Sequence, residues 1–429
     1  MTAEVAVMNR LAVALAADSA VTIETAGGQK IYNTANKLFM LSKYRPVGIM
    51  VYGRADLLDV PWETIIKNYR RKLNSRRFDA LNEYAEDFIR FLDRGNPLFP
   101  EEVQHRYFLV SVLGYFMLIQ ANIDNKVKQR LSEKREIVER EVRDITAATI
   151  DEHYQQLRQR KDLPGIPGKH LAEVLAKYRD AIAQARTRAF AKLPLTRRAI
   201  TQLGRIAASL FCKDKFSDSH VGLVVAGFGE RETFPSLEAF LIDGMANGRL
   251  KYKRIPGARV DFANAAMIQA FAQQDMVMTF MEGINPFYQK ALNAYLGRLI
   301  DDFSACILQQ CPMPRGPRGN SYAGRLKEAS KELVKEFRER LDAHKDEMHV
   351  SPILQTVAIL PKDELAAMAE SLVNLTSFKR RVSLAAETVG GPIDVAVISK
   401  GDGFVWIKRK HYFKAELNPH FIAGYHRER

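Results

Sequence analysis

The chain has 429 residues, of which 47% are hydrophobic and 27% are charged, a balance that excludes a disordered chain and a single small module. Lysine and arginine outnumber aspartate and glutamate by 64 to 50, and the formal net charge of +14 favours contact with acidic surfaces. The three cysteines, Cys212, Cys306 and Cys311, are odd in number and have no CxxC spacing. This argues against a disulfide scaffold and a structural zinc site, and favours a reducing compartment.

Neither a secretory signal nor a membrane span is predicted. The opening residues 1–5 lack the basic, apolar and small-residue order of a signal peptide, so we expect a cytoplasmic protein. The longest apolar run, residues 107–119, is interrupted by Ser111 and Gly114 and is shorter than the roughly 20 residues that span a bilayer. We interpret it as a buried helix.

Short strands are predicted at the start of the chain. Residues 4–8 and 11–16 are apolar runs joined by the polar pair Asn9-Arg10, which predicts a β-hairpin. Residues 37–41 and 47–52 predict two further strands, and the second of these is apolar throughout, as in a sheet covered on both faces.

Helical periodicity replaces this pattern from about residue 56 to residue 217. Trp62, Ile65, Ile66, Tyr69 and Leu73 lie three to four residues apart, which predicts an amphipathic helix. An apolar stripe among charged residues predicts one long amphipathic or coiled-coil arm, unless it is only a solvated helical face. The stripe consists of Ile123, Val127, Leu131, Val138, Val142 and Ile145.

Strands return in the middle and at the end of the chain. Residues 221–229, 239–243 and 249–253 are predicted strands, the last two joined at Asn247-Gly248, a strong hairpin signal. A second helical block is predicted over residues 262–360. A helix over residues 362–387 then precedes strands at 393–399 and 404–409, which residues 400–403 connect.

This order predicts one sheet system with helices inserted between its strands. The strand-bearing segments are residues 2–60, 218–257 and 362–410. The helical segments are residues 61–217 and 258–361, and residues 411–429 form a basic tail.

The sequence contains none of the common catalytic motifs, HExxH, GxSxG or GxxxxGK[ST], and no clustered cysteines and histidines, so no metal or other cofactor is predicted. Thr2, however, follows the initiator methionine and is small enough to allow its removal. The free α-amine has an unperturbed pKa near 8 and can accept the proton of the hydroxyl group on the same residue. Asp18, Lys37 and Gly53 supply an acid, a cation and a backbone donor at predicted strand ends.

A resemblance to a known family extends this reading. Thr2 before a hairpin, residues 15–22, 36–41 and 47–56 resemble the opening of a proteasome β-type subunit, in the style of the bacterial proteasome-like peptidases without a propeptide. Residues 225–228 with 241–243, and residues 390–398, resemble the same family's middle and last strands. The resemblance implies a four-layer αββα N-terminal-nucleophile (Ntn) hydrolase fold of the α+β class, with extensive helical insertions.

The resemblance also implies a threonine peptidase or amidohydrolase and its site. Thr2 would be the nucleophile, Lys37 would lower the pKa of its hydroxyl group, Asp18 would orient Lys37, and the Gly53 N–H would stabilise the oxyanion. Ser19 is a further supporting candidate. The family has a serine before its Gly-Gly pair, whereas this chain has Glu387 and Thr388, which are candidates to support the amine.

Two alternatives remain open. The first is a catalytically inactive Ntn-fold protein that serves assembly or interaction. The second, ranked last, is a nucleic-acid-associated protein that uses its basic residues, since no nucleic-acid-reading motif is present. Those residues are Arg70, Arg71, Lys72, Arg76, Arg77 and the loop at 315–318. The partners implied by the main reading are a peptide or protein substrate, further copies of the chain in a ring-like homo-oligomer, and an ATPase or an acidic protein.

Overall fold

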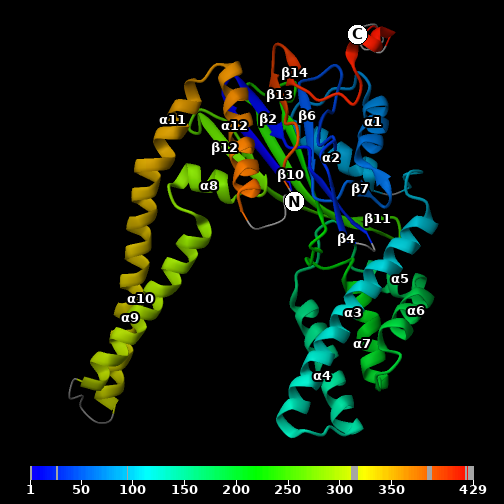
Figure 1. The fold of residues 1–429 in the computed structure, drawn as a ribbon, viewed down its shortest axis with the longest axis vertical. Coiled ribbons are helices and arrows are strands. Elements are labelled where there is room, and N and C mark those ends of the chain that lie inside the picture. The colour runs from blue at the N-terminus through cyan, green and yellow to red at the C-terminus, as the bar shows by residue number, and fades with distance from the viewer. Residues whose placement is uncertain are drawn as a thin grey trace. The chain divides into compact units, whose positions relative to one another are not determined.

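The computed structural model describes residues 2–25, 28–93, 95–310, 317–383, 389–420 and 423. The chain divides into two compact units. The first unit combines Met1–Ala35 with Arg259–Glu428, and the second is Asn36–Ala258. Each contains a five-stranded antiparallel sheet with helices (Figure 1), so the chain has the mixed helix and antiparallel-sheet content that was predicted. The four-layer stacking stays a prediction.

The sheet of the first unit joins both ends of the chain. Its order is β12-β1-β2-β13-β14. The strands are β1 (Ala3–Asn9), β2 (Ala12–Ala17), β12 (Ala266–Ala272), β13 (Asp394–Ser399) and β14 (Gly403–Lys408). The central strand β2 pairs with β1 on one side and β13 on the other, so that Ala14 lies opposite Val7 and Val397. Most residues of β2 are alanine, and their small side chains are all buried within the closely packed core.

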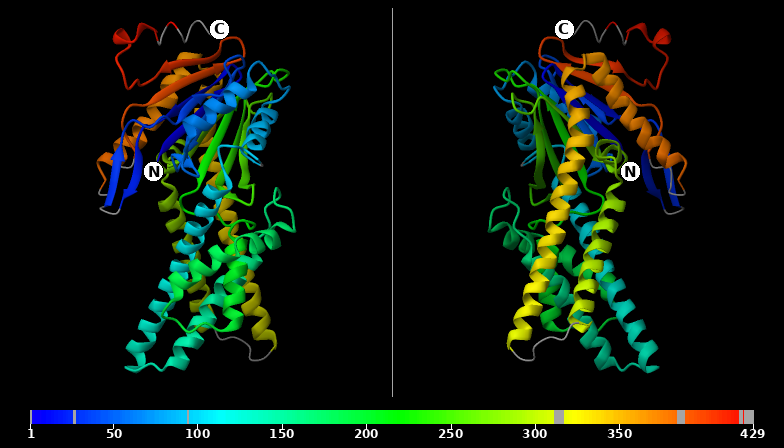
Figure 2. Two further views of the ribbon diagram at one scale, coloured as in Figure 1. Left: turned by 90° about the vertical axis from the view of Figure 1, so that its right-hand side faces the viewer. Right: turned by 90° about the vertical axis from the view of Figure 1, so that its left-hand side faces the viewer.

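Helices cover this sheet and extend from it. The helix α12 (Lys362–Arg381) packs on β1 and β2, with Leu365, Ala369 and Val373 in the apolar core. The long helices α9 (Pro286–Gln310) and α10 (Pro317–Lys345) run side by side as a hairpin (Figure 2). The remaining elements are β3 (Val21–Thr25), β4 (Gly28–Tyr32), α8 (Asp275–Glu282), a π-helical turn (Asp346–Val350), α11 (Ser351–Ile359) and a 3₁₀ turn (Ala415–Leu417).

The sheet of the second unit has the order β11-β10-β9-β6-β5. Its strands are β5 (Leu38–Met40), β6 (Val47–Tyr52), β9 (Val221–Gly227), β10 (Ser236–Ala246) and β11 (Arg249–Arg259). Asn247 and Gly248, which connect β10 to β11, have φ values of +50° and +68°, as the predicted hairpin turn requires. A two-stranded ribbon, β7 (Asp56–Leu57) and β8 (Val60–Pro61), follows β6.

Two apolar clusters organise the helices of the second unit. The helices are α1 (Trp62–Leu73), α2 (Leu81–Leu92), α3 (Glu101–Lys134), α4 (Glu139–Gln159), α5 (His170–Lys177), α6 (Arg179–Phe190) and α7 (Arg197–Ser209). The helices α1 and α2 pack on the sheet, where Tyr69 meets Phe88 edge to face with ring centroids 4.9 Å apart. The second cluster joins α3 to α4, α6 and α7, and in it Phe108 stacks on Tyr178 at 4.1 Å.

Two sequence-based expectations are wrong, and one further hairpin was not predicted. Residues 266–272 form the strand β12 and not helix, because their backbone pairs with β1. The stripe from Ile123 to Ile145 is not one arm, since α3 ends at Lys134 and α4 starts anew at Glu139. Arg135, the residue after α3, has a left-handed φ of +66°. Residues 21–32, assigned to no strand, contain the hairpin of β3 and β4.

The helix α3 is longer than the buried helix predicted for residues 107–119, and only one of its faces is buried. Phe108, Val112, Phe116 and Ile119 are buried on one face, while other apolar side chains, such as that of Met117, are exposed. Among the described residues α3 is the one helix long and apolar enough to cross a membrane. Core helices of soluble proteins meet the same criterion, and the buried face of α3 packs within its own unit.

Candidate active site

Thr2 lies immediately before β1, an internal strand of the first unit's sheet. Thr2 is buried, with 3% of its surface exposed. The Thr2 carbonyl accepts a hydrogen bond from the Gln273 N–H at 3.1 Å, one residue beyond the end of β12. This bond extends the pairing of β1 with β12 to the first residue of the predicted mature chain, and so fixes the carbonyl side of Thr2.

The Asp18 carboxylate fixes the other half of the same peptide group. Asp18 follows β2 and is 1% exposed. Its Oδ1 accepts the Ala3 N–H at 3.0 Å, and its Oδ2 accepts the N–H groups of Ala20 at 3.1 Å and Gly390 at 3.0 Å. A buried carboxylate is costly unless such donors surround it, and hydrogen bonds to an ionised acceptor are stronger than those to a neutral one. Asp18 therefore ties the first residues to the turn before β13.

Ser19 strengthens that tie. Its N–H donates to the Gly390 carbonyl at 3.1 Å, and its hydroxyl group donates to the carbonyl of Pro392. Ser19 is thus placed beside the Gly-Gly segment, where the sequence predicted a supporting residue. The other two candidates there, Glu387 and Thr388, lie outside the described residues.

Lys37 and Gly53 belong to the second unit. Lys37 immediately precedes β5, is 6% exposed, and accepts the Val51 N–H on its carbonyl at 2.9 Å. Gly53 follows β6 with a φ of +89°, and a Cβ atom there would lie 2.3 Å from the His220 carbonyl oxygen. Both the backbone angle and the close approach of another strand require glycine at this position.

The structure therefore brings Thr2, Asp18 and Ser19 together within the first unit. In the second unit, Lys37 precedes β5 and Gly53 follows its antiparallel partner β6. The roles predicted for these residues stay predictions. Sequence reasoning missed Gln273 and Gly390 as backbone donors. The Gly-Gly pair in the sequence could have indicated Gly390. Nothing in the sequence indicated Gln273, because the strand before it was predicted to be helix.

A metal centre has no support in the described part of the chain. No group of three or more His, Cys, Asp or Glu side chains that could hold a metal ion occurs among these residues.

Comparison with known proteins gives no assignment. No family model matches the chain, and no curated protein matches it. The solved structures similar to it include the Anbu (Gly-1) mutant from Hyphomicrobium sp. strain MC1, at 10% identity and a TM-score of 0.27, with 100% of this chain and 97% of that chain covered. Anbu (ancestral beta-subunit) from Yersinia bercovieri has the same identity and TM-score, with 98% and 94% covered.

A likeness at this level does not establish a shared fold and carries no argument about this chain. The assignment to the proteasome β-type family, made from the sequence resemblance, is therefore wrong. No family model recognises the chain, and the structural likeness stays at a TM-score of 0.27.

Proposed function

We propose that the chain is an amidohydrolase that uses Thr2 as an N-terminal nucleophile after removal of Met1. The observation that supports this best is the anchoring of the peptide group between Thr2 and Ala3. Its carbonyl accepts the Gln273 N–H, and its N–H donates to the buried Asp18 carboxylate. With both polar groups of this peptide held, the amine and hydroxyl group of Thr2 start from a fixed Cα, as an efficient nucleophile requires.

Besides water, the reaction needs only groups that Thr2 and the substrate supply. The α-amine accepts the hydroxyl proton while Oγ attacks the carbonyl carbon of the substrate amide. The tetrahedral intermediate then expels the leaving amine, which takes the proton, and an ester to Thr2 remains. Water hydrolyses this ester, returns the hydroxyl group and releases the acid.

Asp18 serves this chemistry by position. Its three N–H donors connect the chain after Thr2 with residues 20 and 390, so the nucleophile is held by a carboxylate that does not itself react. The substrate class is a peptide or another amide. The contributions of Lys37 and Gly53, self-assembly into a ring and a cytoplasmic location remain parts of the proposal drawn from the sequence.

Intact-mass measurement of the purified chain combined with a β-lactone probe tests the proposal. Thr2→Val is the matched control, because valine has the shape of threonine without its hydroxyl group and is small enough for Met1 removal. We expect Met1 to be absent from all forms. The probe adduct should map to residue 2 in the wild type and in Thr2→Ser, and be absent from Thr2→Val.

Hydrolysis of a panel of fluorogenic peptide amides should follow the same pattern. Retention of Met1 in the wild type, a processed chain without an adduct, or undiminished hydrolysis by Thr2→Val would each refute the proposal.

A further inference from the structure

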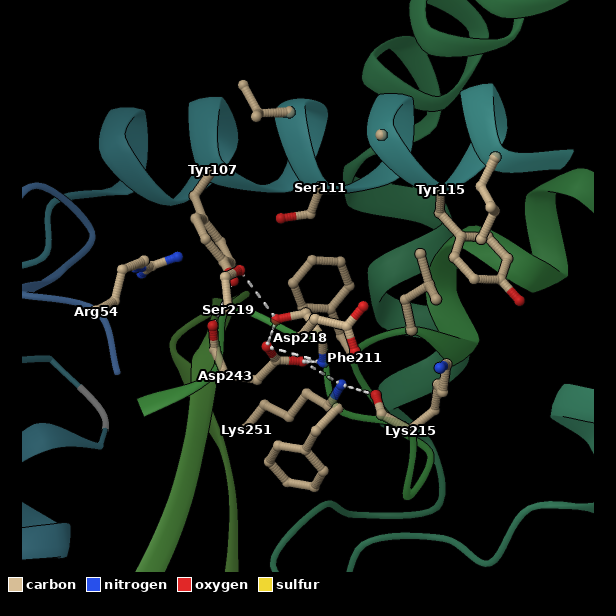
Figure 3. Close-up of a pocket in the computed structure, with 16 residues that line it drawn as sticks. Arg54, Tyr107, Ser111, Tyr115, Phe211, Lys215, Asp218, Ser219, Asp243 and Lys251 are labelled. Carbon is tan, nitrogen blue, oxygen red and sulfur yellow. Dashed lines mark hydrogen bonds and ion pairs between the residues drawn. The ribbon is translucent and has the colours of Figure 1, made fainter. Parts of the chain in front are cut away.

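The reaction proposed at Thr2 uses neither a cavity under α3 nor the surface of the α9–α10 hairpin. The cavity has a volume of 390 Å³, and the buried ion pair of Lys251 and Asp243, 2.7 Å apart, lies in it (Figure 3). Arg54, which also lines it, lies 3.4 Å from Asp56. Since these charges are paired within the protein, they do not indicate the charge of a ligand. The hairpin, in contrast, leaves large apolar side chains exposed.

The exposed apolar side chains of the hairpin form one stripe on each helix. On α9 they follow each other at steps of three or four residues, which places them on one side of the helix. They are Tyr288, Leu292, Tyr295, Leu299 and Phe303, and between 38% and 66% of each residue is exposed. On α10 they are Tyr322, Leu333 and Phe337, which are 43% to 61% exposed. These eight side chains are together named the hairpin face.

The contact between α9 and α10 is narrow and antiparallel. The Arg338 guanidinium donates to the Asn293 carbonyl at 3.3 Å, and the hydroxyl groups of Ser304 and Ser330 lie 2.6 Å apart. The residue numbers rise on α9 as they fall on α10, so the two helices run in opposite directions. Among the described side chains of the two helices, Ser304 and Ser330 are the buried ones, and both are small. The contact therefore does not fully bury any large apolar side chain.

The stripes of the two helices lie on the same side of the hairpin. Leu292, Phe303 and Phe337 each precede by one position a residue that contacts the other helix. One position corresponds to a turn of about 100° around the helix axis, in the same sense on both helices. Because the helices are antiparallel, equal turns around their own axes bring both stripes to one side. The hairpin face is therefore one continuous apolar surface.

The charges around the hairpin face are mixed in sign. The helices α9 and α10 contain ten lysines and arginines and seven aspartates and glutamates. On α10 these charges pair along the helix, since Lys335 lies 3.2 Å from Glu332 and Arg340 lies 2.6 Å from Glu336. A helix that binds an anionic lipid surface instead has a polar side rich in lysine and arginine. Mixed and paired charges suit a partner surface that is mixed in the same way, as that of another copy is.

The hairpin face is also large enough for stable association. Taking about 200 Å² for a fully exposed side chain of this size, its exposed parts amount to roughly 900 Å². Stable protein interfaces bury about 800 Å² on each partner. Two hairpin faces packed against each other would form a four-helix bundle, in which the stripes of all four helices become the core.

From these observations we propose that a second copy of the chain covers the hairpin face, so that two hairpins pack as an intermolecular four-helix bundle. Both copies use the same surface, as in a two-fold symmetric dimer. The contact lies in the helical segment of residues 258–361. It does not depend on the reaction proposed at Thr2 or on assembly into a ring.

Light scattering coupled to size-exclusion chromatography of the full chain tests this contact through Leu299→Glu. Leu299 lies in the middle of the α9 stripe and is 66% exposed, so the substitution is compatible with the fold of one chain. In the bundle the new carboxylate would be buried without a partner. We expect the mass of the particle to fall to half that of the wild type, and the dissociation constant to rise at least about a hundredfold.

Ala294→Glu is the matched control, because it adds the same carboxylate to an exposed position of the same helix outside the stripe. It should keep the wild-type mass. Cys306 provides a second measurement, since its free thiol is exposed on α9, three residues after Phe303. In a chain with Cys311→Ser, maleimide labelling of Cys306 should slow several-fold as the protein concentration rises. This slowing should be absent when Leu299→Glu is added.

Three results would overturn the proposal. The first is a wild-type particle with the mass of one chain at micromolar concentration. The second is an unchanged mass in Leu299→Glu that has the helix content of the wild type by circular dichroism. The third is sedimentation with phosphatidylglycerol vesicles by the wild type but not by Leu299→Glu, because a membrane would then be the partner of the hairpin face.

Discussion

Among single residues, Asp18 has a demanding environment, because its carboxylate accepts three backbone N–H groups while almost fully buried. In Asp18→Asn, one acceptor oxygen becomes an NH₂ group that faces a donor. We expect the free energy of unfolding to fall by about 3 kcal/mol, from a lost charge-assisted hydrogen bond and an unsatisfied buried N–H. Urea denaturation measures this, and amide hydrolysis should fall as well because the Ala3 N–H is released.

The control is Asp402→Asn. Asp402 also accepts hydrogen bonds, from Lys362 and Ser399, but its side chain is 57% exposed. Water replaces the lost partner there, so we expect a much smaller fall in the free energy of unfolding than in Asp18→Asn. Equal effects of the two substitutions would show that the Asp18 carboxylate does not anchor the first residues of the chain.

Gly53 illustrates a residue whose backbone conformation limits substitution. In Gly53→Ala a Cβ atom would be forced to within 2.3 Å of the His220 carbonyl oxygen at a φ of +89°. We expect a loss of about 2 to 3 kcal/mol in the free energy of unfolding, since strain and a backbone clash act together. Gly95→Ala is the control, because Gly95 has a φ of +67° but open space, and it should cost about 1 kcal/mol. Thermal and urea unfolding of both variants measure these losses. A larger loss of stability in Gly95→Ala than in Gly53→Ala would contradict the prediction.

Between elements, His153 connects α4 to α3 through two hydrogen bonds. Its Nδ1 lies 3.2 Å from the Tyr115 hydroxyl oxygen, and the Asn122 amide nitrogen lies 3.1 Å from its Nε2. Donation by the Asn122 amide fits a neutral ring that carries its proton on Nδ1. Burial lowers the pKa of His153 below its ordinary value of 6.5, and the neighbouring Glu152 opposes this shift.

This pKa shift predicts an acid-sensitive contact. Between pH 6.5 and the lower pKa of the folded state, the unfolded chain binds the proton more readily, so the free energy of unfolding falls as the pH falls. Above pH 6.5 the contribution of His153 is fully present. We expect the stability lost between pH 7.5 and pH 5.5 in urea unfolding to be smaller in His153→Gln than in the wild type. His170, whose pKa burial also lowers, remains in both proteins and cancels in the comparison. An equal loss in both proteins would exclude this role for His153.

Local sequence patterns predicted those elements whose signal is contained within a few residues. The β1–β2 hairpin, β6, β9, the turn at Asn247 and the β13–β14 hairpin were all predicted close to their observed bounds. The strand β12 was not, because Ala, Met, Ile, Gln and Phe are compatible with helix and its extended form depends on pairing with β1, more than 250 residues earlier. The break at Arg135 was missed since an arginine in a left-handed conformation has no sequence signal.

The candidate site shows the same division. The sequence identified Thr2 and Asp18 from chemistry and position, and the carboxylate does lie against the residue that follows Thr2. Its other partners could not be predicted, because the Ala20 and Gly390 N–H groups converge on it only once the turn before β13 is in place. Backbone donors have no residue-type signature. The cavity under α3 was missed for a related reason, since its Lys251 and Asp243 form a pair only across the β10–β11 hairpin.

At the scale of the molecule, the first unit depends on both ends of the chain. β13 covers one edge of β2 over six residue pairs, from Asp394 opposite Ala17 to Ser399 opposite Ala12. Without β13, the uncharged strand β2 would present unpaired N–H and C=O groups, which favours aggregation. The Asp18 carboxylate would also lose the Gly390 donor.

A truncation after residue 388 tests this dependence. We expect the shortened chain to be largely insoluble, and any soluble fraction to lack a cooperative urea transition at the wild-type midpoint. A truncation after residue 418 keeps β13 and β14 and should behave as the full chain does, so the loss would follow from the missing strands and not from a shorter polypeptide. Hydrolysis should disappear with the first truncation and persist with the second, because the anchoring of Asp18 requires Gly390. A soluble chain ending at residue 388 with the wild-type unfolding midpoint would mean that β2 does not need its C-terminal partner, and that the sheet of the first unit is stable without the end of the chain.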